Sequence, residues 1–128
     1  MIRYDIVASG SKGNATLLSS GTTLIQIDMG VSLSRLENGL ANLHSSLFQI
    51  QALLITHEHS DHIKGLSLRT YQKAKIPLYC TAGTVDHPDH LIVPDEGFFI
   101  GDFSIFPFSA SHDATNPVGF VFQQGKEK

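Results

Sequence analysis

The sequence predicts an α/β (α+β) protein in which two helical segments lie among short strands along the chain. Three observations predict this class. Strand-like segments fill the beginning and the end of the chain, two segments between them have the helical spacing of apolar residues, and turns rich in glycine or proline separate the segments. The chain has 128 residues, an apolar share of 41% and a charged share of 16%, which is ordinary for a folded protein. We therefore expect a single domain over residues 1–128.

The N-terminal part of the chain predicts three strands. Ile2–Val7 alternates between apolar and polar residues, and Ala15–Ser19 and Thr23–Asp28 flank a Ser-Gly-Thr turn that is typical of a β-hairpin. Glycine and serine dominate the loop Ser9–Asn14. Its backbone N–H groups and Lys12 could contact phosphates, and a plain turn explains this composition equally well.

Two helices are predicted farther along the chain. The first spans Ser32–Leu43, where leucines recur at helical spacing and Ser32 or Ser34 can cap the start. The second spans Asp61–Lys75, with Tyr71 among its core residues, and ends before Pro77. Further strands are predicted at Ala52–Ile55, Pro77–Cys80, Phe98–Ile100, Phe103–Phe106 and Val118–Phe122, whereas Thr81–Pro94 predicts turns.

The densest set of metal-binding side chains lies directly after the buried strand Ala52–Ile55. Within six residues the chain carries His57, His59, Asp61 and His62. In an extended segment alternate side chains point the same way, so His57 and His59 can bind one ion, and a helix beginning near Asp61 directs Asp61 and His62 toward a second. Imidazole and carboxylate ligands suit zinc (Zn2+) first, with Mn2+ or iron as alternatives. The competing interpretation is a polar surface loop.

Charge and cysteine content limit the environment in which the chain works. The net charge of -3 argues against a strongly basic nucleic-acid surface, but bound metal ions can neutralise phosphates locally, so nucleic-acid substrates are not excluded. The single Cys80 rules out an internal disulfide and fits a reducing compartment. We find no leader and no apolar run long enough to span a membrane. We expect a cytoplasmic protein with no membrane segment.

Other residues capable of chemistry are interpreted as structural. The segment Asp86–His90 is a proline-broken loop without a strand or helix to fix its geometry, so we leave its residues out of the site, as we do His44. Cys80 at the end of a short strand is interpreted as a small buried residue. The phenylalanine-rich stretch Phe98–Phe108 is interpreted as core rather than as a base-stacking platform.

Several segments, taken in order, resemble the metallo-β-lactamase superfamily of metal-dependent hydrolases, and within it the YycJ (WalJ)-like group. Thr56–His62 matches the HxHxDH metal motif of the superfamily, which is highly specific after a buried strand. The other matching segments are Ser9–Thr16 (opening loop), Ile27–Gly30 (first motif) and Ser111–Ala114 with Asn116–Phe120 (a later motif). The resemblance runs from Met1 to the end of the chain and implies the N-terminal half of a four-layer αββα sandwich, apparently truncated.

The resemblance also implies the roles of individual residues. The first metal would be bound by His57, His59 and His112, and the second by Asp61 and His62. For His112 alone, the alternative is a solvated loop histidine. The family pattern adds a bridging aspartate and a further histidine that this chain lacks, and Asp113 does not match the bridging position.

Asp28 closes the first matching motif. By resemblance it is an outer-shell carboxylate that supports the metal-binding histidines. The alternative is that Asp28 simply ends a strand and caps a turn.

The activity implied by the resemblance is hydrolysis by water that two metal ions activate, with Asp61 as a ligand that also orients the water. The implied substrate is a DNA phosphodiester. Esters, lactones and thioesters are alternatives within the superfamily. A rival hypothesis is a non-catalytic truncated fragment that folds by association. A half sandwich would expose an apolar face, which predicts a homo-oligomer or association through that face.

Overall fold

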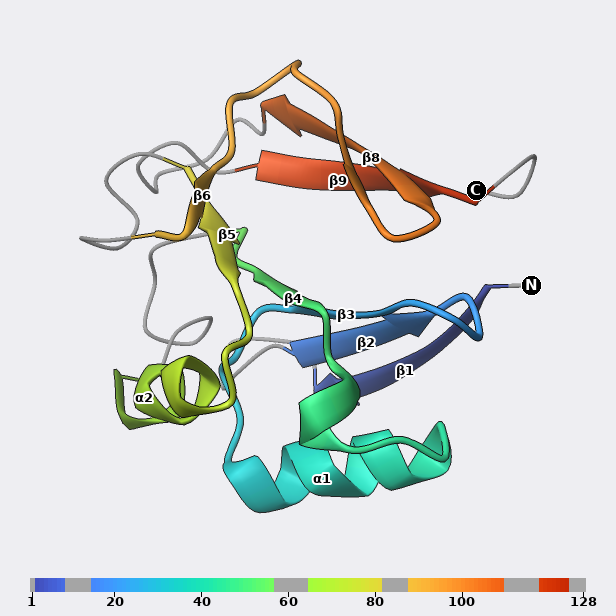
Figure 1. The fold of residues 1–128 in the computed structure, drawn as a ribbon, viewed down its shortest axis with the longest axis vertical. Helices are drawn as coiled ribbons and strands as arrows, with labels where there is room; N and C mark the ends of the chain where they lie inside the picture. The colour runs from blue at the N-terminus through green and yellow to red at the C-terminus, as the bar shows by residue number, and fades with distance from the viewer. Residues whose placement is uncertain (1, 9–14, 57–64, 82–87, 110–117, 125–128) are drawn as a thin grey trace.

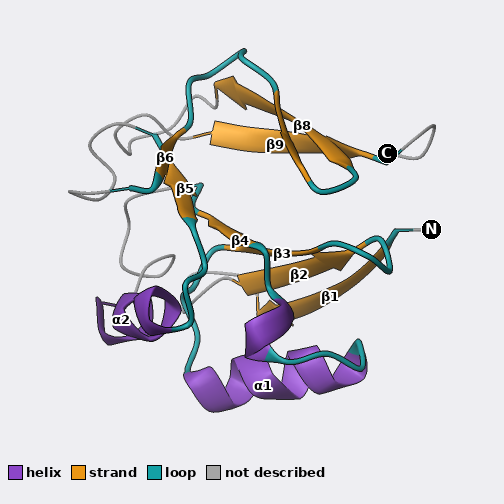
Figure 2. Cartoon of the chain, viewed as in Figure 1, coloured by secondary structure: helices purple, strands orange, loops and turns teal. Residues whose placement is uncertain are grey.

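The computed structural model describes residues 2–8, 15–56, 65–81, 88–109 and 118–124. Within these residues the chain forms two β-sheets that lie face to face, with helices on the outer side of the first sheet (Figure 1). Figure 2 shows the same layers coloured by secondary structure. The α/β class predicted from the sequence is confirmed.

The first sheet has six strands in the described part of the chain, in the order β1-β2-β3-β4-β5-β6. Their bounds are Arg3–Ala8 (β1), Ala15–Ser19 (β2), Leu24–Ile27 (β3), Ala52–Leu54 (β4), Leu78–Cys80 (β5) and His90–Leu91 (β6). β1, β2 and β3 are antiparallel, and β3 through β6 run parallel to one another. The carboxyl ends of β3, β4, β5 and β6 therefore lie along one edge of the sheet.

The predicted hairpin between β2 and β3 is confirmed. Ser19 pairs with Leu24, and the turn between them places Gly21 at a φ of 98°. Alternation along the paired strands directs Leu17 toward the helices and Leu18 and Ile25 toward the second sheet. Both faces of this sheet are thus apolar, as expected for strands that are covered on two sides.

Two helices cover one face of the first sheet. Helix α1 (Leu33–Asn42) begins after Ser32, whose Oγ accepts a hydrogen bond from the Arg35 N–H at 3.4 Å, so the predicted cap is confirmed. A 3-10 turn, η1 (Leu47–Gln49), follows. Helix α2 (Gly65–Lys73) ends before the proline, as predicted, and buries Tyr71, whereas the predicted start at Asp61 lies outside the described residues. Among the described residues, no helix has the length and apolar character needed to cross a membrane.

The second sheet consists, in the described part of the chain, of the antiparallel strands β7 (Phe98–Ile100), β8 (Phe103–Ser109) and β9 (Val118–Gln123). The predicted turn at Gly101-Asp102 is confirmed by the pairing of Ile100 with Phe103. Phe103 and Ile105 are buried in the apolar cluster between the two sheets. This cluster joins the two sheets into one structure.

The interpretation of the whole stretch Phe98–Phe108 as core is wrong for three of its five phenylalanines. The exposed fraction is 77% for Phe99, 44% for Phe106 and 42% for Phe108. Successive side chains of a strand point to opposite faces, so only alternate positions of β7 and β8 reach the core.

The segment Thr81–Pro94 also departs from the expectation, because it contains β6. His90 pairs with Tyr79 and Leu91 with Cys80 in parallel register. The His90 ring stacks on Tyr79 with 4.4 Å between ring centroids, and Asp89 Oδ2 accepts a hydrogen bond from the Leu78 N–H at 2.7 Å. The prediction that this segment has no scaffold is therefore wrong for Asp89 and His90. A strand of two residues is too short to show a periodicity in the sequence. The pairing with β5 is what holds β6 in an extended conformation.

Candidate metal centre

The edge formed by the carboxyl ends of the parallel strands is where the candidate site begins. Asp28 follows β3 directly, and Thr56 lies two residues after β4 in the neighbouring position. The HxHxDH run starts with the next residue. The predicted ligands His57, His59, Asp61, His62 and His112 all lie outside the described residues, and Asp28 lies within them.

The Asp28 carboxylate binds Thr56 at two points. Its Oδ1 accepts a hydrogen bond from the Thr56 backbone N–H at 2.8 Å, and its Oδ2 accepts one from the Thr56 hydroxyl at 2.8 Å. The Asp28 residue is buried, so water competes little for these bonds. Asp28 therefore restrains both the backbone and the side chain of the residue that precedes His57.

The backbone of Asp28 is in the left-handed region, with a φ of 65°. This conformation costs a non-glycine residue about 1 kcal/mol, although aspartate tolerates it better than most. Two hydrogen bonds hold the Asp28 backbone in this conformation. The Asp28 N–H donates to the Leu54 carbonyl at 2.7 Å, and the Asp28 carbonyl accepts from Gln26 Nε2 at 3.0 Å. Strained conformations that surrounding contacts over-determine in this way are concentrated at functional sites.

Gln26 and Tyr71 complete this arrangement. Tyr71 was predicted only as a core residue, and Gln26 was not singled out in the sequence. Gln26 is fully buried, and its Nε2 also lies 3.2 Å from the sulfur of Met29. The Tyr71 hydroxyl donates to Gln26 Oε1. Burial raises the pKa of Tyr71, so its hydroxyl stays protonated and available as a donor. The sequence feature that could have identified Gln26 is its position inside a strand with apolar neighbours on both sides. A glutamine there is buried, and a buried amide requires partners.

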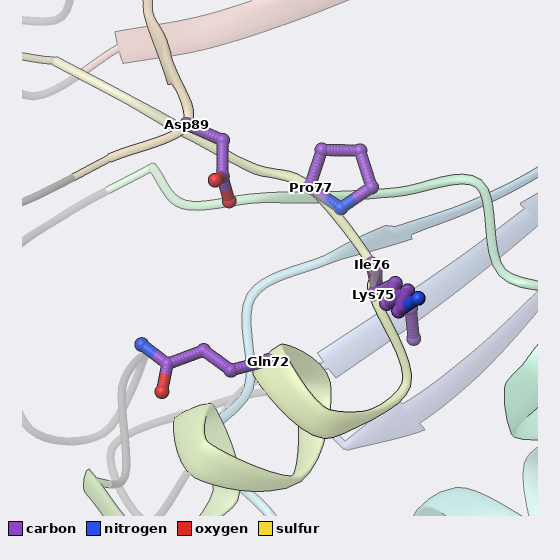
Figure 3. Close-up of a pocket in the computed structure, with 5 residues that line it drawn as sticks. All are labelled: Gln72, Lys75, Ile76, Pro77 and Asp89. Carbon is purple, nitrogen blue, oxygen red and sulfur yellow. The ribbon is translucent and has the colours of Figure 1, made fainter.

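A groove of about 390 Å³ lies at the opposite edge of the sheet and is separate from this site. It is lined by Gln72, Lys75, Ile76, Pro77 and Asp89 (Figure 3). Pro77 precedes β5 and Asp89 precedes β6, so the groove adjoins the amino ends of these strands. The described part of the chain holds no cluster of three or more His, Cys, Asp or Glu side chains that could bind a metal.

Comparison with known proteins identifies the family. Residues 24–128 match the family described as Beta-lactamase superfamily domain. Exodeoxyribonuclease YycJ of Bacillus anthracis is 30% identical over 138 aligned residues, which cover 99% of this chain and 52% of that protein. Exodeoxyribonuclease WalJ of Streptococcus pneumoniae serotype 2 is 32% identical over 136 residues, which cover 95% of this chain and 50% of that protein. The chain thus spans about half the length of the curated relatives it matches.

Solved structures show the same fold. The class B3 di-zinc metallo-β-lactamase LRA-12 from an Alaskan soil metagenome superposes with a TM-score of 0.75 at 16% sequence identity, covering 91% of this chain and 55% of that one. At this identity the likeness concerns the fold alone. The two sheets and their helices correspond to the N-terminal half of that fold. Together, the family match and the fold show that this chain belongs to the metallo-β-lactamase superfamily.

Proposed function

We propose that this chain is the N-terminal part of a metal-dependent hydrolase that cleaves nucleic-acid phosphodiesters. The observation that carries the proposal is the two-point hydrogen bonding of the Asp28 carboxylate to Thr56, at the strand end where the HxHxDH run begins. An outer-shell carboxylate in this position orients the ligands that follow it. The names of the two exodeoxyribonuclease relatives support a DNA substrate.

The chemistry of the donor set fits zinc, with Mn2+ or iron as alternatives. In the proposed site, one ion is bound by His57, His59 and His112 and the second by Asp61 and His62. When bound, the ions supply Lewis acidity toward water and toward a phosphoryl oxygen. The protein contributes the placement of the ligands through Asp28 and Thr56, and Asp61 also orients the attacking water.

Two other functions remain as alternatives. One is hydrolysis of esters, lactones or thioesters, because this fold supports several reactions through the same kind of site. The other is a non-catalytic fragment that folds by association.

We further propose that residues 1–128 form a single, incomplete domain. A cytoplasmic location is likewise a proposal, supported by the presence of a single cysteine in the sequence, and Cys80 is buried, as predicted.

The metal assignment is tested by measuring the zinc content of the purified protein. We expect His57→Ala and His59→Ala each to remove most of the bound zinc, because each deletes a direct ligand. The control is His44→Ala, which removes an exposed imidazole from the end of α1 and should leave the zinc content unchanged. Unchanged zinc in the two ligand variants would exclude this assignment.

The substrate class is tested with the same proteins in the presence of Zn2+ or Mn2+. Because the chain by itself lacks the bridging aspartate and the last histidine of the family pattern, we expect it to be inactive alone and to release nucleotides from end-labelled linear DNA only when it is joined to the C-terminal half of a relative. In that joined protein His57→Ala should abolish the release. Hydrolysis of a model thioester or lactone without DNA cleavage would favour the first alternative. Bound zinc without hydrolysis of any of these substrates would favour the non-catalytic fragment.

A further inference from the structure

The turn at Asp28 contacts the chain on both sides of the proposed metal-ligand run. The run follows Thr56 in the sequence, and the chain is described again from Gly65, at the start of α2. On the sheet side, the Asp28 carboxylate binds Thr56. On the helix side, Tyr71 of α2 donates to Gln26, which in turn donates to the Asp28 carbonyl at 3.0 Å. A continuous series of hydrogen bonds therefore joins α2 to the residue before His57.

The polar pair Gln26–Tyr71 has a cost that an apolar pair would avoid. Both residues are almost fully buried, within the layer between the first sheet and the helices. Burying an amide and a hydroxyl requires that each finds a partner, whereas apolar side chains of similar size would simply fill the space. All buried polar side-chain atoms of the described residues do find partners. Such a fully satisfied network restricts its members to one arrangement, which is what a site with several ligands requires.

We propose that Gln26 and Tyr71 are positioning residues, which hold the Asp28 turn in its left-handed conformation and so fix Thr56, the residue that precedes the metal-ligand run. The proposal rests on the proposed metal site for its functional meaning. The mechanical part, the restraint of Thr56 by α2 through Gln26 and Asp28, can be measured without metal.

The first experiment measures amide hydrogen exchange at Thr56 in metal-free protein. The variants are Tyr71→Phe, Gln26→Leu and the double variant. We expect Thr56 exchange to be about 3- to 10-fold faster in all three, because Gln26→Leu removes the bond to the Asp28 carbonyl and Tyr71→Phe removes the bond that orients Gln26. The matched control is Tyr4→Phe, which deletes a hydroxyl from a tyrosine that is 67% exposed and should leave exchange unchanged.

The double variant separates positioning from stability. Tyr71→Phe leaves the Gln26 amide oxygen without this donor, and Gln26→Leu leaves the Tyr71 hydroxyl without this acceptor, so each single variant should lower the melting temperature. The double variant replaces both members of the pair by apolar groups and should regain that part of the loss, although the bond from Gln26 to the Asp28 carbonyl stays absent. We expect Thr56 exchange to stay fast in the double variant. If slow exchange returned together with stability, or if the single variants did not change exchange, the positioning role would be refuted.

The second experiment titrates the same variants with Co2+ and with Zn2+. We expect about 3- to 10-fold weaker binding and an altered Co2+ visible spectrum in all three variants, including the double variant. If the unmodified protein binds metal and the three variants show the same affinity and the same Co2+ spectrum, the positioning role is refuted. The proposed metal site is then still supported. Absence of binding by the unmodified protein would overturn the metal site and the functional role of the pair, while the exchange measurement would still decide the mechanical restraint.

Discussion

The two sheets of this protein differ in how their faces are covered. The first sheet has helices α1 and α2 on one face and the second sheet on the other, and its central strands are buried on both sides. The second sheet buries Phe103 and Ile105 on its inner face, and its outer face exposes large apolar side chains. These are Phe99, Phe106, Phe108 and Val121. A sheet that is apolar on both faces is suited to two covering layers, and only the inner face of this sheet is covered in the described part of the chain.

The two ends of strand β3 make different contacts. At the turn before β3, the Asp102 carboxylate of the second sheet accepts hydrogen bonds from Ser20 at 2.7 Å and from Thr22 at 3.1 Å. The Asp102 N–H donates to the Thr23 hydroxyl at 3.2 Å. At the other end of β3 lies Asp28 with the candidate site. One end of β3 thus connects the sheets, and the other end adjoins the proposed metal-ligand run.

The largest expected effect compares two phenylalanines of the same hairpin. Phe103→Ala removes a fully buried ring from between the sheets and should lower the free energy of unfolding by about 3–5 kcal/mol. Phe99→Ala removes a ring that is 77% exposed and should cost less than about 1 kcal/mol. Urea denaturation of both variants measures the difference. Similar losses would show that the outer face is as well covered as the inner one.

The next prediction concerns association through the outer face. Replacing Phe99 and Phe106 by serine reduces the exposed apolar surface of the second sheet, so we expect a smaller average mass in dilute solution than for the unmodified chain. Light scattering coupled to size exclusion measures this mass. The control is Phe48→Ser, which removes an equally exposed ring from η1, away from that face. A stable monomer of the unmodified chain would contradict the prediction.

The smallest expected effect is the pH dependence of the stabilisation that Asp102 contributes by connecting the two sheets. Hydrogen bonds from Ser20, Thr23 and Thr22 lower the pKa of Asp102 from 3.8 to about 2. Because the folded-state pKa lies below the ordinary value, the stabilisation is fully present above about pH 4 and is lost as the pH falls through about 2. The carboxylate is exposed, so the contribution should be less than about 1 kcal/mol.

Urea midpoints of the unmodified chain and of Asp102→Asn test this effect between pH 6 and pH 2. The unmodified chain should be the more stable at pH 6, and the difference should shrink toward pH 2. A difference that did not change with pH would show that the charge of Asp102 contributes nothing to the connection.

Much of the fold was predictable because its signals are local. The hairpins at Gly21 and at Gly101-Asp102 and the cap at Ser32 depend on a few neighbouring residues, and all were predicted. The strand β6 was not predictable, since its two residues are ordered by pairing with β5. The outward orientation of Phe99 and Phe106 was also missed, because residue type alone does not reveal which face of a strand is covered.

For the site, the sequence by itself determined the family and the candidate ligands, because the HxHxDH spacing is a local pattern of donor groups. It also named Asp28 while leaving its role open between a ligand support and a simple turn. Only the tertiary structure decided which contacts Asp28 makes, since Thr56 is 28 residues away in the chain. The same holds for Gln26 and Tyr71, which lie 45 residues apart. Their hydrogen bond exists because parallel strands and a helix bring distant residues into one buried layer, and no local pattern records that proximity.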